Sequence, residues 1–201
     1  AGLLGALFGA VFIASLEHPG SFDINLSGTP FFIIGGKTVV GGLVGGMLAI
    51  EGLKKALGIT TRTGDAFVLP LAVGMSIGRL GCFFTGMPDA TYGMETPFPW
   101  GVDFGDGILR HPTQLYEILF IWALAGWILR KDGEGGLPNG WMFHTYMVGY
   151  LWWRLMVDFI KPSDFEFIGL TAIQWTCFLA LIWYHSKGRI AITTEQGSEE
   201  E

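Results

Sequence analysis

The stretch AFVLPLAVGMSIGRLGCFF, residues 66–84, decides the class of fold, because its nineteen residues include one charged side chain, Arg79. A helix that crosses the hydrocarbon core of a bilayer needs about 20 mostly apolar residues. The rest of the chain has the same character: half of its 201 residues are apolar, 15% are charged, and the mean hydropathy is +0.45. A soluble domain typically carries about 25% charged residues. The sequence therefore predicts an integral membrane protein.

Other apolar stretches extend this prediction to an all-α integral membrane protein with about six transmembrane helices. They cover residues 2–16, 31–53, 66–84, 113–129, 141–160 and 167–184. The first is short and begins at residue 1 without a Met, so we interpret it as a truncated span; it lacks the basic region that opens a signal peptide. We expect a single polytopic membrane domain over residues 1–201. Within it we expect an irregular external head at 85–112, where prolines and glycines disfavour a long helix, and a disordered cytoplasmic tail at 190–201.

The basic residues between these stretches predict the orientation. Seven lie in the segments 54–65, 130–140 and 185–201, whereas the segments 17–30, 85–112 and 161–166 hold only Arg110 and Lys161. Cytoplasmic loops carry the excess of Lys and Arg. The first set of segments is therefore expected in the cytoplasm, together with the C-terminus, and the second set outside.

Composition also excludes several classes of protein. A formal net charge of -6 without a basic cluster argues against nucleic-acid binding. The two cysteines, Cys82 and Cys177, lie in apolar stretches and do not form a disulfide framework. No metal-ligand spacing occurs, so we expect neither a metal nor a cofactor.

Ionisable side chains that fall inside the expected spans include Lys37, Arg79, Glu117, Arg154 and Asp158. Such residues are costly in a bilayer and commonly mark functional sites. Lys37, Arg79, Glu117 and Arg154 each lie within roughly 10 Å of the external end of their span, at a rise of about 1.5 Å per residue. Cations and carboxylates at this depth suit the headgroup of an anionic phospholipid. Snorkelling of Lys37 and a structural Arg154–Asp158 ion pair remain the alternatives.

Further residues around these positions are candidates for the same site. Thr38 adjoins Lys37, and Gly41 and Gly42 either pack against another helix or leave room for a headgroup. Gln114 shares a helix face with Glu117, and Tyr150 shares one with Arg154. His111 lies at the expected water boundary, beside Arg110 and on the same motif as Glu117.

Four motifs carry a resemblance to a known family. They are GGLVG at 41–45, GRLGCF at 78–83, RHPTQLYE at 110–117, and the stretch 149–164, which contains Tyr150, Arg154 and Asp158. Over about residues 30–165 the chain resembles the prolipoprotein diacylglyceryl transferases. The third motif is the most specific of the four, and the order and spacing of all four agree with the family.

The resemblance implies a multi-pass enzyme of the bacterial cytoplasmic (inner) membrane whose active side faces outward. It would transfer the diacylglyceryl group of phosphatidylglycerol to the lipobox cysteine thiol in the signal peptide of a prolipoprotein. The family's two essential arginines fall on Arg79 and Arg154, and its two acids fall on Glu117 and Asp158. We therefore expect a catalytic set of Arg79, Arg154, Glu117 and His111. For the phospholipid headgroup we expect Lys37, Thr38, Gly41, Gly42, Cys82, Gln114, Tyr116, Tyr150 and Asp158.

Three positions depart from the family pattern. Val40 stands where the family usually has His, Cys82 where it has Asn, and Met87 where it has Glu. With Val40 unable to take the thiol proton, His111 and Glu117 are the candidates for that step. One alternative is a non-catalytic paralogue that binds anionic phospholipid or a lipoprotein partner. A transporter is a weaker alternative, because the sequence contains no internal repeat.

Overall fold

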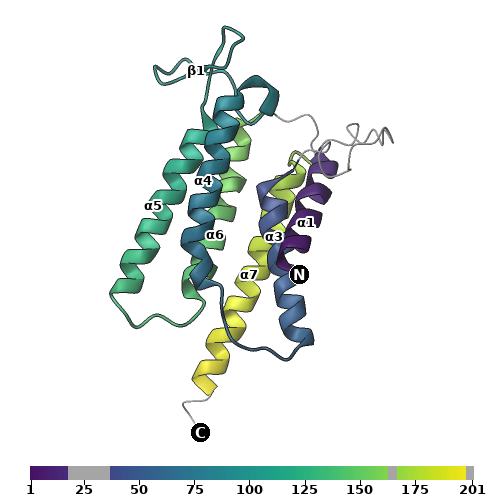
Figure 1. Cartoon of the computed structure of the whole chain (residues 1–201), viewed down its shortest axis with the longest axis vertical. Coiled ribbons are helices and arrows are strands. Elements are labelled where there is room, and N and C mark those ends of the chain that lie inside the picture. Colours follow the sequence, from purple (N-terminus) through teal and green to yellow (C-terminus); the bar gives the residue numbers. More distant parts are fainter. Residues whose placement is uncertain (18–36, 163–166, 198–201) are drawn as a thin grey trace. The chain divides into compact units, whose positions relative to one another are not determined.

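A computed structural model describes residues 1–17, 37–162 and 167–197, and this part of the chain contains six α-helices and little strand. The expectation of an all-α protein is confirmed. The chain divides into two compact units, residues 1–60 with 164–201 and residues 61–163. Each unit is described separately below (Figure 1).

The first unit is built on contact between the backbones of two helices, α1 (Gly2–Glu17) and α3 (Val39–Ala56). A Cβ atom added at Gly41 would lie 2.3 Å from the carbonyl oxygen of Gly9, and one added at Gly45 would lie 2.4 Å from that of Gly5. Small residues of this kind allow membrane helices to approach closely. Gly41 and Gly45 of α3 therefore serve close helix packing.

Helix α3 begins later than the sequence predicts, and this corrects the placement of Lys37. Thr38 is the N-cap: its hydroxyl accepts the Gly41 N–H at 3.2 Å. Lys37 precedes this cap and is exposed, so it lies before α3 and not within it. Residues 31–36 of the expected span, and the rest of 18–36, lie outside the described residues.

Helix α7 (Ala172–Gly197) also differs from expectation at its start. Its start is fixed by a capping box in which Gln174 N–H donates to Thr171 Oγ1 (3.1 Å) and Thr171 N–H donates to Gln174 Oε1 (3.0 Å). The expected span at 167–184 therefore begins about one turn too early. At its other end the helix is described to Gly197, and residues 198–201 lie outside the described part; the expected disordered tail at 190–201 stays a prediction.

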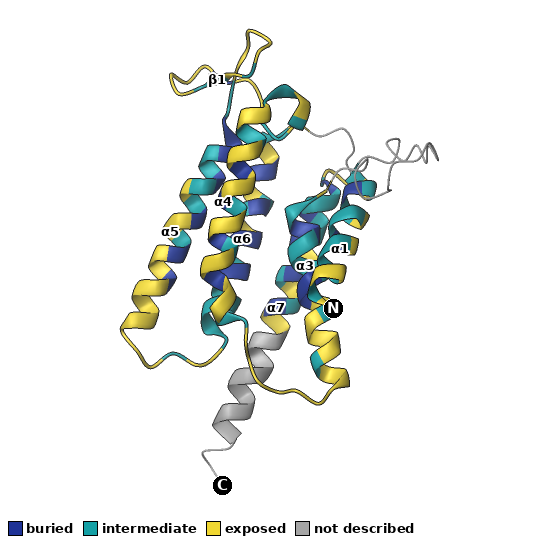
Figure 2. Ribbon diagram, viewed as in Figure 1, coloured by how far each residue is buried: buried dark blue, intermediate teal, exposed yellow. Residues whose placement is uncertain are grey.

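The second unit is a bundle of three helices, α4 (Val68–Thr85), α5 (Thr113–Gly133) and α6 (Trp141–Val157). Short 3₁₀ turns extend two of them, η1 (Asp65–Phe67) before α4 and η3 (Asp158–Ile160) after α6. Ile121, Tyr146 and Leu151 are fully buried between the helices, and Figure 2 shows the buried residues on the facing sides. These bounds confirm the expected helices at 66–84, 113–129 and 141–160.

One carboxylate joins the starts of α4 and α6. Asp65, in the turn before α4, accepts the Gly140 N–H at 2.5 Å with one oxygen and the Phe143 N–H at 2.8 Å with the other. The first N–H groups of a helix have no partner within the helix. Asp65 therefore caps α6 from a neighbouring element.

The segment between α4 and α5 forms a small irregular head, as expected. It contains the turn η2 (Met87–Asp89) and two short antiparallel strands, β1 (Val102–Asp103) and β2 (Leu109–Arg110). The Asp103 carboxylate accepts the backbone N–H groups of Gly105, Asp106 and Gly107 and so orders the connecting loop. The loop also contains an ion pair of 2.6 Å between Asp106 and Arg110.

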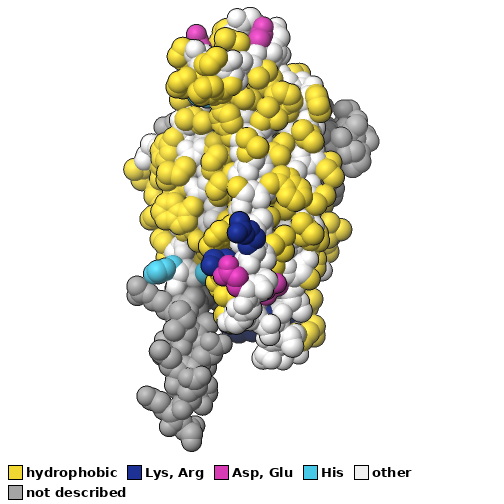
Figure 3. Space-filling model, turned by 90° about the vertical axis from the view of Figure 1, so that its left-hand side faces the viewer, with side chains coloured by type: hydrophobic (Ala, Val, Ile, Leu, Met, Phe, Trp, Pro, Cys, Tyr) yellow, Lys and Arg dark blue, Asp and Glu magenta, His cyan; other side chains and the backbone are white. Residues whose placement is uncertain are grey.

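Apolar side chains on the outside of the bundle bear on its surroundings. Ile77, Phe84 and Leu119 are each at least 65% exposed, and Figure 3 shows hydrophobic side chains covering much of the face that it presents. In the described residues, the segment Asp65–Thr85 is long and apolar enough to cross a membrane, judged by length and composition. The other expected spans remain predictions.

Candidate functional site

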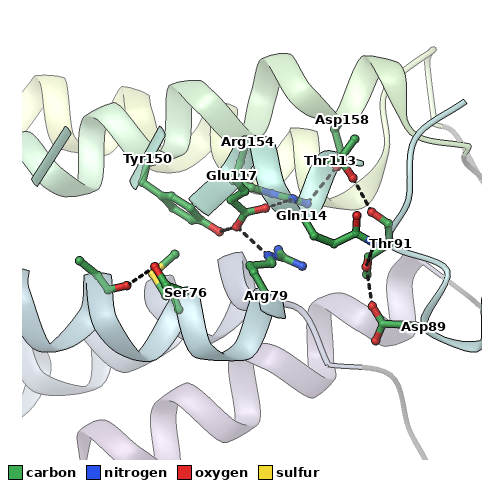
Figure 4. Close-up of polar contacts among 12 residues, drawn as sticks. Ser76, Arg79, Asp89, Thr91, Thr113, Gln114, Glu117, Tyr150, Arg154 and Asp158 are labelled. Carbon is green, nitrogen blue, oxygen red and sulfur yellow. Dashed lines mark hydrogen bonds and ion pairs between the residues drawn. The ribbon is translucent and has the colours of Figure 1, made fainter. Parts of the chain in front are cut away.

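The Glu117 carboxylate is the centre of a buried charged cluster between α4, α5 and α6 (Figure 4). One of its oxygens, Oε1, accepts the Tyr150 hydroxyl at 2.6 Å and lies 2.9 Å from Arg79 Nε. The other, Oε2, accepts from Arg154 Nη1 at 3.2 Å. Glu117 is 1% exposed, so its charge is held by these neighbours and not by water.

Arg154 uses both terminal nitrogens within the protein. Nη1 donates to Glu117, and Nη2 donates to Asp158 Oδ1 at 2.9 Å. Arg154 and Asp158 are four residues apart on α6 and its 3₁₀ extension, which places their side chains on the same face. The ion pair expected from the sequence is present, and it holds the Arg154 side chain toward Glu117.

Arg79 is arranged differently. It comes from α4, is 7% exposed, and approaches Glu117 through Nε in an ion pair that is out of line for a hydrogen bond. Its ion pair with Glu117 does not use the terminal nitrogens Nη1 and Nη2, and the Cys82 thiol lies near the same guanidinium. A guanidinium fork is well suited to bind a phosphate through two parallel hydrogen bonds. Arg79 therefore offers an anion-binding group that Arg154 does not.

A second polar network begins beside this cluster. Gln114 Nε2 donates to Thr91 Oγ1 at 3.1 Å, and the Thr91 hydroxyl donates to Asp89 Oδ2. Thr113 donates to the Thr91 carbonyl at 2.5 Å. Gln114 Oε1 is buried and has no donor among the described residues. It is therefore an acceptor to which a ligand hydroxyl could donate.

Sequence reasoning missed Asp89 and Thr91. They lie in the head, where no helical periodicity marks them and where the contact with α5 spans more than twenty residues of sequence. The polar spacing Asp-x-Thr was the available signal, but it is too common to identify a site.

The structure places His111 apart from the charged cluster. Its Nδ1 lies 3.1 Å from the Tyr116 hydroxyl, and its ring lies 6.0 Å from that of Phe98. No hydrogen bond or ion pair within the described residues joins His111 to Arg79, Glu117 or Arg154. The pair with Tyr116 brings together two predicted site residues, and their roles stay predictions.

Cys82 lies one turn after Arg79 on α4 and is partly buried. Its thiol is near both the Arg79 guanidinium and the Asp89 carboxylate. Met87, which follows α4, lies in the 3₁₀ turn η2. The neighbourhood of Arg79 therefore contains a thiol.

The remaining candidates belong to the first compact unit. Gly41 contacts Gly9 of α1, and Gly42 faces Ala6 and Ala10, so close packing explains both. Thr38 caps α3, and its N–H donates to the Ala10 carbonyl at 3.2 Å. A role in headgroup binding for Lys37, Thr38, Gly41 and Gly42 stays a prediction.

Side chains that could hold a metal do not cluster in the part of the chain that the structure describes. In the head, the hydrogen bonds from Arg110 hold the pKa of Asp106 below its usual value. The chemistry that the buried cluster supports is binding and stabilisation of an anion.

Comparisons with known proteins agree with this chemistry. The family model described as prolipoprotein diacylglyceryl transferase matches residues 1–185. A phosphatidylglycerol–prolipoprotein diacylglyceryl transferase of Geobacter sulfurreducens is 32% identical over 176 residues, which cover 85% of this chain and 64% of that protein. The enzyme of the same name from Bordetella parapertussis is 34% identical over 148 residues, covering 69% and 53%. That of Polynucleobacter asymbioticus is 30% identical over 195 residues, covering 90% and 72%.

The chain spans between about half and two thirds of the length of the first two of these relatives. No solved structure matches it. The family model nevertheless covers most of the chain, including every residue of the buried cluster and of the network around Thr91. The chain therefore belongs to the prolipoprotein diacylglyceryl transferase family.

Proposed function

We propose that the protein transfers the diacylglyceryl group of phosphatidylglycerol to the lipobox cysteine thiol of a prolipoprotein. The observation that carries this proposal is the guanidinium of Arg79, a residue only 7% exposed whose contact with Glu117 uses Nε and not the terminal nitrogens, beside the Arg154–Glu117 pair. The names of the relatives supply the substrates, phosphatidylglycerol and a prolipoprotein.

Arg79 is the group that binds the phosphate of the phospholipid. Its two terminal nitrogens offer parallel donors, and its Nε contact with Glu117 fixes the plane of the guanidinium. The low exposure of the site strengthens the attraction, because little water screens the charges.

Arg154, Glu117, Asp158 and Tyr150 act as positioning residues around Arg79. Arg154 is held on both sides by carboxylates, and Tyr150 fixes the Glu117 oxygen that faces Arg79. Together the two arginines and two carboxylates are electrically neutral, so the cluster is stable without a ligand and is still rich in donors. Gln114 Oε1 is the acceptor for a hydroxyl of the glycerol headgroup.

The reaction begins when the acceptor thiol loses its proton, because the thiolate is the nucleophile. The sulfur attacks the glycerol carbon that bears the phosphate, the C–S bond forms, and the C–O bond to the phosphate breaks. Glycerol phosphate leaves, and the guanidinium of Arg79 stabilises the departing charge. Both Glu117 oxygens already accept hydrogen bonds, from Tyr150 and Arg154, which disfavours Glu117 as the proton acceptor. Of the two candidates that the sequence offers for this step, Glu117 and His111, this leaves His111.

This function requires a multi-pass arrangement in the bacterial cytoplasmic membrane, with the head and the charged cluster on the outer side and the C-terminus in the cytoplasm. The distribution of basic residues supports that orientation. The apolar outer faces of α4 and α5 support contact with lipid.

The test is incubation of the full chain, in vesicles of labelled phosphatidylglycerol, with a lipobox peptide. We expect thioether-linked diacylglyceryl peptide from the parent and none from Arg79→Ala or Arg154→Ala. Arg130→Ala, at the opposite end of α5, is the matched control and should retain the parent rate. Transfer at the parent rate by Arg79→Ala would overturn the assignment of the phosphate-binding group.

A second candidate function is binding of anionic phospholipid without transfer. The replacement of three family positions by Val40, Cys82 and Met87 favours it, since the retained residues are mainly those that hold an anion. In the same assay, a parent that binds phosphatidylglycerol vesicles but yields no modified peptide at any pH would support this function over transfer.

A further inference from the structure

One atom of the buried Gln114 amide lacks a hydrogen-bond partner within the described residues. Gln114 is 1% exposed and lies one turn before Glu117 on the same face of α5. Its Nε2 donates to Thr91 Oγ1 at 3.1 Å, whereas Oε1 accepts from no group in the described part of the chain. A buried acceptor without a donor is costly. Figure 4 shows this amide between the charged cluster and Thr91, so its oxygen is placed to receive a hydrogen bond from a ligand.

The hydrogen bonds around Thr91 decide which atom of the amide is left over. An ionised carboxylate accepts hydrogen bonds and donates none. The Thr91 hydroxyl therefore directs its single proton toward Asp89 Oδ2 and presents a lone pair to Gln114. The group of Gln114 that faces Thr91 must then be the NH₂, which leaves the oxygen on the other side of the amide.

Thr91 is itself held in place from the start of α5. Thr113, the residue before Gln114, is 1% exposed and donates its hydroxyl proton to the Thr91 carbonyl at 2.5 Å. Two consecutive residues of α5 thus contact the backbone and the side chain of Thr91. Asp89 ends the turn η2, two residues before Thr91. The head therefore supplies the groups that orient an amide of the buried site.

We propose that Asp89 and Thr91 are positioning residues that make the site selective for a phospholipid headgroup with a free hydroxyl. This selectivity rests on the proposed transfer function and deepens it, because it gives two residues of the head a role in the choice of substrate. Asp89 sets the direction of the Thr91 hydroxyl, and Thr91 sets the orientation of the Gln114 amide. Gln114 Oε1 then accepts a hydrogen bond from the headgroup, while Arg79 binds the phosphate that every phosphodiester lipid shares.

The charge of Asp89 is what gives this chain of hydrogen bonds its direction. In Asp89→Asn the new amide can donate to Thr91 as well as accept from it. The Thr91 hydroxyl is then free to donate to Gln114, and the Gln114 amide can turn over and present its NH₂ to the headgroup. A headgroup that accepts hydrogen bonds without donating them therefore becomes a better ligand of this variant than of the parent.

The experiment uses two lipids of equal charge, phosphatidylglycerol and the same lipid with both headgroup hydroxyls methylated, which accepts hydrogen bonds but cannot donate them. Each lipid displaces labelled phosphatidylglycerol from the purified full chain in detergent micelles, and the measured quantity is the ratio of the two affinities. The variants are Asp89→Asn, Thr91→Val and Thr91→Ser. Asp132→Asn, an exposed aspartate near the other end of α5, is the matched control.

We expect the parent to prefer phosphatidylglycerol about tenfold, as the loss of one hydrogen bond to a buried acceptor implies. The preference should fall to about threefold or less in Asp89→Asn and Thr91→Val, with a gain in affinity for the methylated lipid in Asp89→Asn. Thr91→Ser keeps the hydroxyl and should keep the parent ratio, as should Asp132→Asn.

The parent ratio in both Asp89→Asn and Thr91→Val would overturn the positioning roles. An equal loss of affinity for both lipids in these variants would also overturn them, because Asp89 and Thr91 would then only stabilise the head. Transfer to a lipobox peptide, measured with the same preparations, tests the proposed function separately. A parent that selects phosphatidylglycerol but yields no modified peptide would overturn the transfer function alone.

Discussion

Glu117→Gln is the substitution that should perturb the buried cluster most clearly. It replaces a carboxylate with a neutral amide of nearly the same shape and leaves two guanidinium groups with Asp158 as the remaining carboxylate. The net charge of the four-residue cluster rises from zero to +1. All four side chains are less than 10% exposed, so water does not compensate for the loss.

The expected cost follows from these contacts. Removing one partner of a buried ion pair typically lowers the free energy of unfolding by about 3–5 kcal/mol. Tyr150→Phe removes one hydrogen bond to the same carboxylate and should lower it by about 1.5–3 kcal/mol. Glu134→Gln breaks an exposed pair with Lys131 and, as the control, should change it by about 0–1 kcal/mol.

Equilibrium unfolding in detergent micelles, followed by tryptophan fluorescence, measures all three variants. Phosphatidylglycerol should stabilise Glu117→Gln more than the parent, because a bound phosphate restores the missing negative charge. A loss below about 1 kcal/mol for Glu117→Gln, or equal stabilisation of both proteins by the lipid, would refute the account of Glu117 as the counter-charge of the arginines.

Three further predictions concern separate parts of the chain. Arg79→Lys should weaken phosphatidylglycerol retention about tenfold or more, because an ammonium lacks the fork; a value within twofold of the parent contradicts this. Gly41→Val should lower the free energy of unfolding by about 1–3 kcal/mol, whereas Gly52→Ala, which has open space for a Cβ, should leave it unchanged or raise it in the same denaturation assay. The Asp106–Arg110 pair should order the head above pH about 4 and lose that effect as the pH falls through the lowered pKa of Asp106. NMR of the head against pH should therefore show an acid transition that Asp106→Asn abolishes.

The helices of the second unit were predictable because their signals are local. Apolar runs of about 20 residues and the Pro112 start of α5 depend on neighbouring residues alone. The start of α3 was not predictable from the sequence, because apolar residues continue on both sides of Thr38 and hide the position of the N-cap. The same reasoning explains α7, whose start depends on two hydrogen bonds within a capping box.

The candidate site divides in the same way. Spacing along α6 predicts that Arg154 and Asp158 share a face, and the common depth of the charges predicts that Arg79 and Glu117 meet them. Spacing does not show which arginine contacts Glu117 through Nε and not through a terminal nitrogen, because that depends on the rotation of three helices about their axes.

The hydrogen bond from the Gly140 N–H to Asp65 holds the starts of α4 and α6 at the same level, and the two helices run in the same direction (Figure 1). Arg79 comes fourteen residues after Asp65, and Arg154 comes fourteen residues after Gly140. At about 1.5 Å per residue, both guanidinium-bearing positions lie roughly 21 Å above that bond. The two helices thus place their arginines at the same distance from that bond. A single residue inserted into either helix would shift its arginine by about 1.5 Å along the helix axis and turn it through roughly 100° about that axis. Length variation between relatives should therefore be tolerated in the head and excluded from these two stretches.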